Sequence, residues 1–293
     1  MSSNTPHPPS GIPISSSTWF VTGINRGLGR SIAEDVMRRG GTVAGTVRKL
    51  ADANELKQRF PDQLWVGELD LSDLANIPKV FSAAVEQLGR VHAVVSNAGY
   101  GLMGAAEELE LDDIRHIVDT NLIGSIQLAR AAVAHMRPLG GGRILQISSS
   151  AGQSAFPAFS LYCATKWGIE GFFDSLSLEV AGFGIGTTLV EPGAIRTGFG
   201  TSAVFSPELA AYREGPVGTV RQMARSGHVG PGDPAKMAKF LVDTFATKVA
   251  PPRLAFGPDA YGHIKMALTN RIEQLESFKD LTMSTNCDDP GTR

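Results

Sequence analysis

Tyr162 and Lys166 lie four residues apart and are residue types that could move a proton together. In a segment of helical period this spacing puts both side chains on one face, where the ammonium group favours the tyrosinate. A free tyrosine titrates at about 10, so without a nearby cation it is a poor proton donor or acceptor at neutral pH. The same pair on a solvent-exposed helix would have no chemical role, so its interpretation depends on the surrounding motifs.

A glycine-rich turn near the start of the chain is suited to a pyrophosphate. An apolar strand candidate runs into Thr22-Gly23-Ile24-Asn25-Arg26-Gly27-Leu28-Gly29, and a helix candidate follows. Glycines allow a tight turn and close backbone approach, and a helix N-terminus offers free N–H groups and a partial positive charge. The spacing is G-x-x-x-G-x-G, not the G-x-G-x-x-G dinucleotide fingerprint, so a glycine-rich turn without a ligand stays an alternative.

The end of the second strand candidate, Thr46-Val47-Arg48, indicates which dinucleotide would bind. NAD enzymes place an acidic residue there against the ribose hydroxyls. This chain has no carboxylate until Asp52, whereas Arg48 and Arg26 could hold a 2′-phosphate through charge-assisted hydrogen bonds. The sequence therefore favours NADP, and two solvated surface arginines are the alternative.

Short apolar runs alternate with stretches of helical period, which is typical of βαβ units and a parallel sheet. We expect strands at 18–22, 42–47, 64–69, 91–96, 143–148, 186–191 and 253–256. We expect helices at 27–39, 77–88, 111–136, 160–180, 234–247 and 260–278. The pattern predicts an α/β fold in which a doubly wound, Rossmann-type, mostly parallel sheet carries helices on both faces.

Residues 18–282 are expected to form a single catalytic domain, with a flexible leader at 1–17 and a loose tail at 283–293. Within that domain, the segment 198–234 is rich in Gly and Pro, and only 207–213 and 217–225 have helical character. We interpret it as a substrate lid over the carboxyl edge of the sheet. The expected pocket is apolar and aromatic, which favours hydrophobic ketones or alcohols, and includes Tyr100, Met103, Phe156, Phe159, Phe199, Phe205 and Tyr212.

Composition excludes several classes of partner. The formal net charge of −2 and pI near 6.3 give no basic field for nucleic acid or anionic lipid. No apolar run reaches the length of a membrane span, so we expect a soluble protein. The only cysteines, Cys163 and Cys287, suggest neither a disulfide framework nor a metal site, so we expect no metal and a reducing, cytoplasmic location.

Several motifs together resemble the short-chain dehydrogenase/reductase family, over about residues 18–197 and more loosely to about 281. The residues that match are the turn from Thr22 to Gly29, Asn97-Ala98-Gly99, Tyr162-x-x-x-Lys166, Ser149 thirteen residues before Tyr162, and Asn121. Ser96 and Thr165 depart from the more usual asparagine and serine. The stretch 162–171 is similar to steroid and retinoid dehydrogenases, but such likeness does not identify a substrate.

The resemblance implies four catalytic residues, Asn121, Ser149, Tyr162 and Lys166. It implies a cofactor site made by Gly23, Asn25, Arg26, Gly27, Leu28, Gly29, Arg48, Asp70, Leu71, Asn97, Ala98, Gly99, Tyr162, Lys166, Pro192, Gly193, Ile195 and Thr197. Members of this family often pair through two long helices, here 111–136 and 160–180, so a homodimer is expected, with a monomer as the alternative.

The expected function is NADP(H)-dependent interconversion of a ketone or aldehyde and an alcohol, as in a carbonyl reductase. Tyr162 would be the acid/base, Ser149 would orient the carbonyl, Lys166 would lower the tyrosine pKa and bind ribose, and Asn121 would anchor a water. A regulator that binds NADP without turnover is one alternative, although it has no need of this proton relay. An isomerase or dehydratase is another, and it needs additional acids or bases in the lid, where Glu208 and Glu214 are the carboxylates before Asp233.

Overall fold

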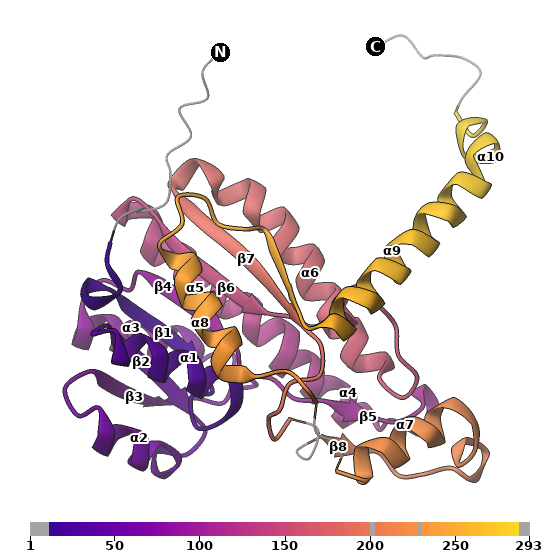
Figure 1. Ribbon diagram of the computed structural model, residues 1–293, viewed down its shortest axis with the longest axis horizontal. Coiled ribbons are helices and arrows are strands. Elements are labelled where there is room, and N and C mark those ends of the chain that lie inside the picture. Colours follow the sequence, from indigo (N-terminus) through magenta and orange to yellow (C-terminus); the bar gives the residue numbers. More distant parts are fainter. Residues whose placement is uncertain (1–11, 200–202, 228–229, 287–293) are drawn as a thin grey trace.

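The structure is a computed structural model that describes residues 12–199, 203–227 and 230–286. Seven parallel strands form its central sheet in the order β3-β2-β1-β4-β6-β7-β9 (Figure 1). These strands are β1 Thr18–Thr22, β2 Thr42–Val47, β3 Leu64–Glu68, β4 Ala93–Ser96, β6 Gly142–Ile147, β7 Ile185–Pro192 and β9 Arg253–Phe256. The predicted fold class, a doubly wound parallel sheet, is confirmed.

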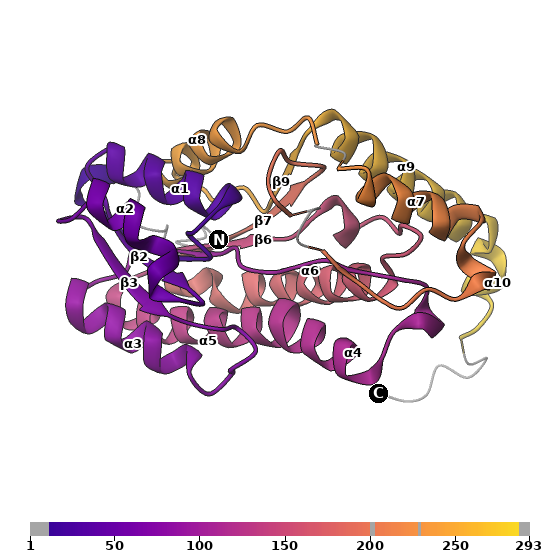
Figure 2. The ribbon, with the colours of Figure 1, turned by 90° about the horizontal axis from the view of Figure 1, so that it is seen from below.

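Helices cover both faces of the sheet (Figure 2). One face carries α1 and α8, and the other carries α3, α5 and α6. The helices are α1 Gly27–Arg38, α2 Asn54–Arg59, α3 Ile77–Leu88, α4 Leu111–Val118, α5 Gly124–Met136, α6 Ser160–Val180, α7 Gly215–Arg225, α8 Pro234–Phe245, α9 Pro258–Ser277 and α10 Lys279–Met283. The last two, α9 and α10, project away from the sheet (Figure 1).

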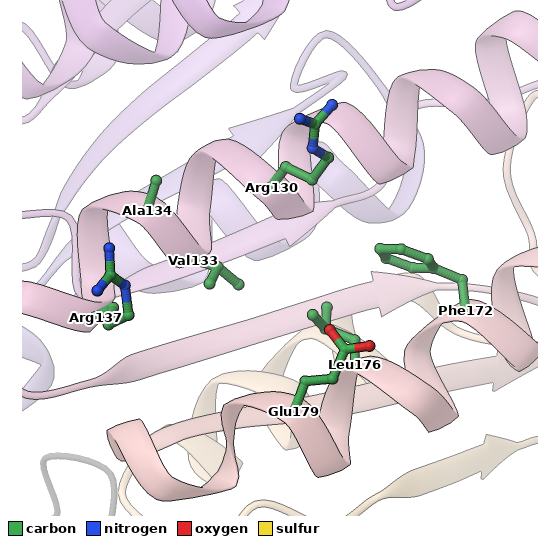
Figure 3. Close-up of a pocket in the computed structure, with 7 residues that line it drawn as sticks. All are labelled: Arg130, Val133, Ala134, Arg137, Phe172, Leu176 and Glu179. Carbon is green, nitrogen blue, oxygen red and sulfur yellow. The ribbon is translucent and has the colours of Figure 1, made fainter.

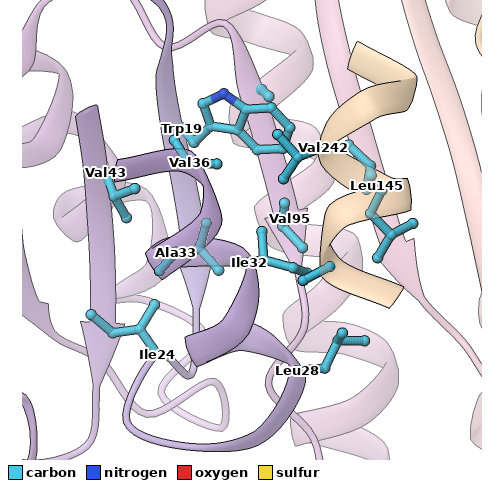
Figure 4. Close-up of a cluster of buried hydrophobic side chains, with 14 of the residues drawn as sticks. Trp19, Ile24, Leu28, Ile32, Ala33, Val36, Val43, Val95, Leu145 and Val242 are labelled. Carbon is cyan, nitrogen blue, oxygen red and sulfur yellow. The ribbon is translucent and has the colours of Figure 1, made fainter. Parts of the chain in front are cut away.

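Alternation along the strands divides the core into two layers. In β1, Trp19 and Val21 pack toward α1 and α8, whereas Phe20 packs toward the opposite helices. Figure 4 shows the first layer, in which Ile32 of α1 and Val242 of α8 lie against strand residues. Because both faces are covered, the five inner strands consist almost entirely of buried residues, whereas the edge strands β3 and β9 are more exposed.

The longest predicted helix, 111–136, is interrupted in the structure. Leu111–Val118 and Gly124–Met136 are α-helical, and the five residues between them, Asp119–Ile123, form a π-helical turn. Such turns within helices are frequent at functional sites. The turn contains Asn121, one of the predicted catalytic residues.

The segment after β7 differs most from its prediction. The predicted helix at 207–213 is wrong, because only a 3₁₀ turn at Ala210–Tyr212 forms there, whereas α7 occupies the second predicted stretch. A two-stranded parallel sheet, β5 Leu102–Met103 with β8 Val204–Phe205, attaches this segment to the loop after β4. Residues 200–202 and 228–229 of the predicted lid lie outside the described residues.

The ends of the chain also differ in part from their predictions. The expected leader extends to residue 17, but Ile12 and Ile14 pack against the core and Ile14–Ser16 form a 3₁₀ turn. Residues 1–11, and residues 287–293 of the expected tail, lie outside the described part of the chain. Within the described ranges, no helix is long and apolar enough to cross a membrane.

Candidate active site

The turn between β1 and α1 has the conformation that its glycines allow. Gly23 and Gly27 adopt positive φ angles of +73° and +62°. At Gly29 a Cβ atom would lie 2.4 Å from Nδ2 of Asn97 and 2.5 Å from the carbonyl oxygen of Gly23, so no side chain fits. The turn is anchored to β2, because the N–H groups of Gly23 and Ile24 both donate to the carbonyl oxygen of Thr46.

The loop after β4 is hydrogen-bonded to the same turn. The hydroxyl of Thr22 accepts from the backbone N–H groups of Asn97 and Ala98, at 2.9 and 3.0 Å. The Asn97 side chain donates back to the Thr22 carbonyl at 2.8 Å. Two predicted cofactor segments, 22–29 and 97–99, are therefore brought together at the carboxyl edge of the sheet, where open α/β folds bind ligands.

The two predicted basic residues flank this turn. Arg26 immediately precedes α1 and makes no side-chain capping bond, and Arg48 directly follows β2. Both are exposed, and neither forms an ion pair with a carboxylate of the described residues. Nearby, Asp70 accepts from the N–H and hydroxyl of Ser72 at 2.9 and 2.7 Å. Burial alone would raise the pKa of Asp70, but the Ser72 bonds, His116 and Arg48 hold it below its usual value.

The loop after β7 lies over the glycine turn. A Cβ atom on Gly27 would lie 3.3 Å from the Thr197 methyl group. Gly193 is packed against Asp259, whose carboxylate would be 2.2 Å from a Cβ at that position. Ile195 forms a parallel bridge with Gly232, and Pro192 ends β7. The predicted residues of this loop thus share the edge occupied by the turn.

Two other predicted cofactor residues have buried side chains. Leu28 lies in the α1–α8 core layer, and Leu71 packs in the opposite layer. Only their backbone groups are placed to contact a ligand. Asn25 is half-buried in the turn, and Gly99 leaves room for Asn121, whose Oδ1 would lie 3.0 Å from a Cβ there.

Ser149, Tyr162 and Lys166 converge at the carboxyl end of β6. Ser149 precedes a 3₁₀ turn, Ser150–Gly152, and its hydroxyl caps that turn by accepting from the Ala151 N–H at 3.1 Å. Ser149 is also hydrogen-bonded to the Tyr162 hydroxyl. The ammonium nitrogen of Lys166 lies 5.6 Å from the centroid of the Tyr162 ring and donates to the Ile147 carbonyl at 2.9 Å.

Burial affects the proton affinity of Tyr162 and Lys166 in opposite directions. It raises the pKa of Tyr162 to about 12, although the hydrogen bond with Ser149 lowers that pKa in part. Burial lowers the pKa of Lys166 to about 8, and the charge of Glu170 opposes this effect. At neutral pH the tyrosine is protonated and most of the lysine is in its ammonium form.

Asn121 fixes the loop after β4. Its Nδ2 donates to the carbonyl oxygen of Tyr100 at 2.8 Å, and its Oδ1 accepts from the Tyr100 N–H at 3.1 Å. The Asn121 carbonyl accepts from the Ser125 hydroxyl at 3.1 Å. In this structure the side chain therefore positions Tyr100, and its predicted role in anchoring a water stays a prediction.

Aromatic rings surround the Tyr162 side chain. The ring centroids of Phe159 and Phe199 lie 5.9 and 5.7 Å from that of Tyr162. Ala158, just before Phe159, has a φ angle of +65°, which is unusual for a residue other than glycine, and its carbonyl accepts from the Gly104 N–H at 2.9 Å. The Tyr162 ring is consequently packed between two other aromatic rings.

Sequence reasoning missed two buried ion clusters near this site. Glu108 and Arg221 form an ion pair with an N–O distance of 2.8 Å and almost no exposure, between the loop after β5 and α7. Glu170 and Glu191 lie buried beside Arg253. A charged residue in a helix usually indicates a solvated face, and no local signal in the sequence shows that these charges meet across distant segments.

Comparison with known proteins identifies the family. A family model described as short chain dehydrogenase matches residues 17–205. The chain belongs to the short-chain dehydrogenase/reductase family. This family uses nicotinamide cofactors, and an oxidoreductase function follows from membership.

Individual relatives cover nearly the whole chain. Oxidoreductase BOA17 of Botryotinia fuckeliana is 32% identical over 269 residues, which span 91% of this chain and 98% of that protein. The crystal structure of a short-chain dehydrogenase from Streptomyces avermitilis is similar with a TM-score of 0.86 and 36% identity, covering 98% of this chain and 100% of the other. An alcohol dehydrogenase of Thermococcus sibiricus, solved with 5-hydroxy-NADP, shares the fold with a TM-score of 0.68 and 23% identity, covering 82% and 95%.

Proposed function

We propose that this short-chain dehydrogenase/reductase is an NADP(H)-dependent carbonyl reductase, or the alcohol dehydrogenase that runs the reverse reaction. The observation that carries the proposal is the Tyr162 hydroxyl, hydrogen-bonded to Ser149 and with the Lys166 ammonium 5.6 Å from its ring. These groups lie at the sheet edge that also carries the glycine turn. An acid, an oxygen-orienting hydroxyl and a nearby cation are the components that carbonyl reduction needs.

The residues present fit a nicotinamide dinucleotide. Gly23, Gly27 and Gly29 leave the backbone of the turn open where a Cβ would clash or strain it. The α1 N-terminus after Arg26 has no side-chain cap, so its N–H groups can bind a pyrophosphate. Asn97, Gly193 and Thr197 would hold the nicotinamide end, and Asp70 the adenine end.

Bound NADPH would supply a hydride to the carbonyl carbon. The protein's own residues do the rest: Ser149 donates a hydrogen bond to the carbonyl oxygen, and Tyr162 gives that oxygen its proton. At neutral pH Tyr162 is in the protonated form that reduction requires, since the pKa of a free tyrosine is already about 10 and burial raises that of Tyr162 to about 12. The Lys166 ammonium stabilises the tyrosinate left behind and would bind the nicotinamide ribose.

Arg26 and Arg48 support a preference for NADP over NAD. Both guanidinium groups are exposed beside the turn without carboxylate partners among the described residues, so they are available to a doubly charged 2′-phosphate. Val47, at the end of β2, is buried and apolar where NAD enzymes carry a carboxylate.

The Phe159 and Phe199 rings support a hydrophobic ketone, aldehyde or alcohol as the substrate.

Within a single catalytic domain at 18–282, we assign the segment 198–234 as the substrate lid, because β8 attaches it to β5 beside these rings. Trypsin digestion tests this assignment: NADPH and substrate together should protect the segment, and unchanged cleavage would contradict it.

The buried free thiol of Cys163 supports a reducing, cytoplasmic location, while Cys287 lies outside the described residues.

A panel of aliphatic, aryl and steroid ketones tests the function. The absorbance of the reduced nicotinamide reports turnover with NADPH and with NADH. We expect turnover of at least one bulky ketone and a higher kcat/KM with NADPH. NADPH binding without turnover of any carbonyl or alcohol would overturn the proposal and favour the alternative of a cofactor-sensing regulator.

We also propose that two copies pair through α5 and α6. A groove between these helices is lined by Val133, Phe172 and Leu176, and none of the predicted site residues lines it (Figure 3). The groove is also lined by Arg137, which directly follows α5, and by Glu179 on α6, and this supports two-fold pairing because each charge can face its opposite on the other copy. Ala134→Glu would add a charge to this groove, so a parent dimer should become monomeric by sedimentation velocity. A monomeric parent would contradict the pairing.

A further inference from the structure

A second group of ionisable side chains lies buried one helical turn beyond Lys166. Glu170 of α6 is 5% exposed and Glu191 of β7 is 2% exposed. The Nε of Arg253, on β9, lies 3.2 Å from a carboxylate oxygen of each. Three elements that are distant in sequence therefore place two carboxylates around one guanidinium.

The loop that carries Ser149 packs against these carboxylates. A Cβ atom on Gly152 would lie 2.8 Å from Oε1 of Glu170 and 2.7 Å from the Ser148 hydroxyl oxygen, so both groups face this glycine. Gln153, from the same loop, donates to Oε1 of Glu191 at 2.6 Å. The carboxylate pair consequently lies directly behind the proposed catalytic loop.

The charges in this cluster do not balance when both glutamates are ionised. Arg253 is the cation that faces them, and it also donates to the exposed Asp174 at 2.6 Å. Two buried carboxylates around one shared cation favour retention of a proton between them. The pKa of Glu170 is raised to about 7, mainly by burial and also by Glu191, while the Ser148 hydroxyl and Arg253 act to lower it. The charge of Glu170 therefore changes near neutral pH.

Glu170 is also the neighbour that acts on Lys166. The two residues are four apart in α6, so their side chains lie on one face of the helix. Burial alone would move the pKa of Lys166 further down, and the negative charge of Glu170 opposes it. Lys166 in turn lies against the Tyr162 ring.

We propose that Glu170 is a positioning residue whose carboxylate, held by Arg253 beside Glu191, keeps Lys166 in its ammonium form. The catalytic consequence rests on the proposed function, in which the ammonium form of Lys166 stabilises the Tyr162 tyrosinate. The charged groups around Glu170 come from each packed element: Lys166 and Asp174 from α6, Glu191 from β7 and Arg253 from β9. The 148–153 loop contributes neutral groups, and Arg271 of α9 reaches only the Gln153 carbonyl among them.

The protonation of Lys166 can be followed without a substrate, by NMR of protein labelled with 13C at the lysine ε carbons. An unperturbed lysine titrates at about 10.4, so a resonance with its midpoint near 8 is distinct. Its loss in Lys166→Met assigns it. Glu170→Gln keeps the side-chain shape, removes the charge, and should lower the Lys166 midpoint by about one pH unit.

Asp174→Asn is the matched control, because Asp174 lies on the same helix and binds the same arginine but is exposed and one turn further from Lys166. It should leave the Lys166 midpoint unchanged. Glu191→Gln removes the repulsion on Glu170, so the small step that Glu170 causes in the Lys166 resonance near neutral pH should move to lower pH. A purely structural role would not produce this shift.

An unchanged Lys166 midpoint in a folded Glu170→Gln protein would overturn the proposal. If that variant does not fold, Glu191→Gln decides instead. The proposal is overturned if the step in the Lys166 resonance near neutral pH has the same midpoint in Glu191→Gln as in the parent. With a ketone that the parent reduces, Glu170→Gln should also lower kcat/KM at pH 8 by about fivefold, the loss of ammonium form that a one-unit shift produces. A parent without turnover rejects the reductase assignment, whereas the substrate-free titration still decides the link between Glu170 and Lys166.

Discussion

We propose that Tyr162 is the proton donor and that the Lys166 ammonium stabilises the tyrosinate left behind. Burial raises the tyrosine pKa to about 12 and lowers the lysine pKa to about 8. The two side chains lie on one face of α6, so the same helix positions the proposed acid and the cation that stabilises its conjugate base. In the proposed mechanism, the protonated tyrosine serves carbonyl reduction at neutral pH, and the reverse oxidation is favoured at higher pH.

We propose that cofactor choice depends on single residues at the end of β2. Arg48→Ala should weaken NADPH by roughly tenfold to a hundredfold, because a charge-assisted hydrogen bond contributes on the order of 1.5 to 3 kcal/mol. NADH, which has a hydroxyl in place of the phosphate, should bind almost as before. Steady-state constants for both cofactors in the parent and the variant measure this effect. Equal weakening of NADPH and NADH would show that Arg48 does not contact the 2′-phosphate.

The residues that carry local motifs could be predicted from the sequence, and the buried charges could not. The glycine turn and the Tyr162–Lys166 pair are recognisable because their function requires fixed spacing within one turn or one helix. Glu170 and Glu191 are 21 residues apart along the chain and share a partner, Arg253, on a third element. Only the packing of α6, β7 and β9 reveals that these charges meet.

At the scale of elements, the strands of the central sheet were predicted within two residues at each end because their apolar runs are short and bounded by polar residues. The exceptions have local causes. The π-helical turn at Asp119–Ile123 does not break the apolar period of the helix around it, so sequence periodicity does not detect it. At the predicted helix 207–213, Leu209 has an extended backbone and its N–H donates to the Glu108 carboxylate, a contact between segments about 100 residues apart.

The ion pair between Glu108 and Arg221 holds α7 to the loop after β5. Both side chains are buried, and Glu108 also accepts from the backbone N–H groups of Ala105 and Leu209, at 2.7 and 2.8 Å. The Arg221 hydrogen bond is the main cause that lowers the pKa of Glu108 to about 2. Arg221→Met should lower the free energy of unfolding by about 3 kcal/mol, because it leaves a buried carboxylate without its cation.

Urea denaturation of Arg221→Met and of the double variant Arg221→Met/Glu108→Gln tests this prediction. The double variant removes the uncompensated charge and should recover part of the lost stability. A cost below about 1 kcal/mol in the single variant would indicate that the pair contributes no more than a surface ion pair does.

The stability of the whole molecule should depend on pH through two histidines at the amino edge of the sheet. His92 Nδ1 accepts from the Thr18 N–H, and His135 Nε2 accepts from the Val91 N–H, each at 3.0 Å. Burial, together with the charge of Arg90, lowers the pKa of both. Below the histidine pKa of the unfolded chain, about 6.5, the unfolded chain therefore binds more protons than the folded one. The free energy of unfolding consequently decreases as the pH is lowered.

Urea denaturation at pH 7.5 and 5.5 tests this dependence: the change in unfolding free energy on acidification should be more negative in the parent than in the variant His92→Asn/His135→Gln. Glu170 acts in the opposite sense, because its raised pKa stabilises the folded state at low pH and this contribution is lost as the pH rises toward 7. Comparing parent with variant separates the histidines from Glu170. An equal difference in both proteins would contradict the assignment.

Tyr162→Phe tests the central claim most directly, because it removes one hydroxyl and retains the ring between Phe159 and Phe199. NADPH affinity, measured by fluorescence titration, should stay near that of the parent. The rate of NADPH oxidation with a ketone that the parent reduces should fall more than tenfold, since the proposed proton donor is gone. Unchanged cofactor binding with turnover below a tenth of the parent is the predicted result. Activity above a tenth of the parent would show that Tyr162 is not the acid in this enzyme.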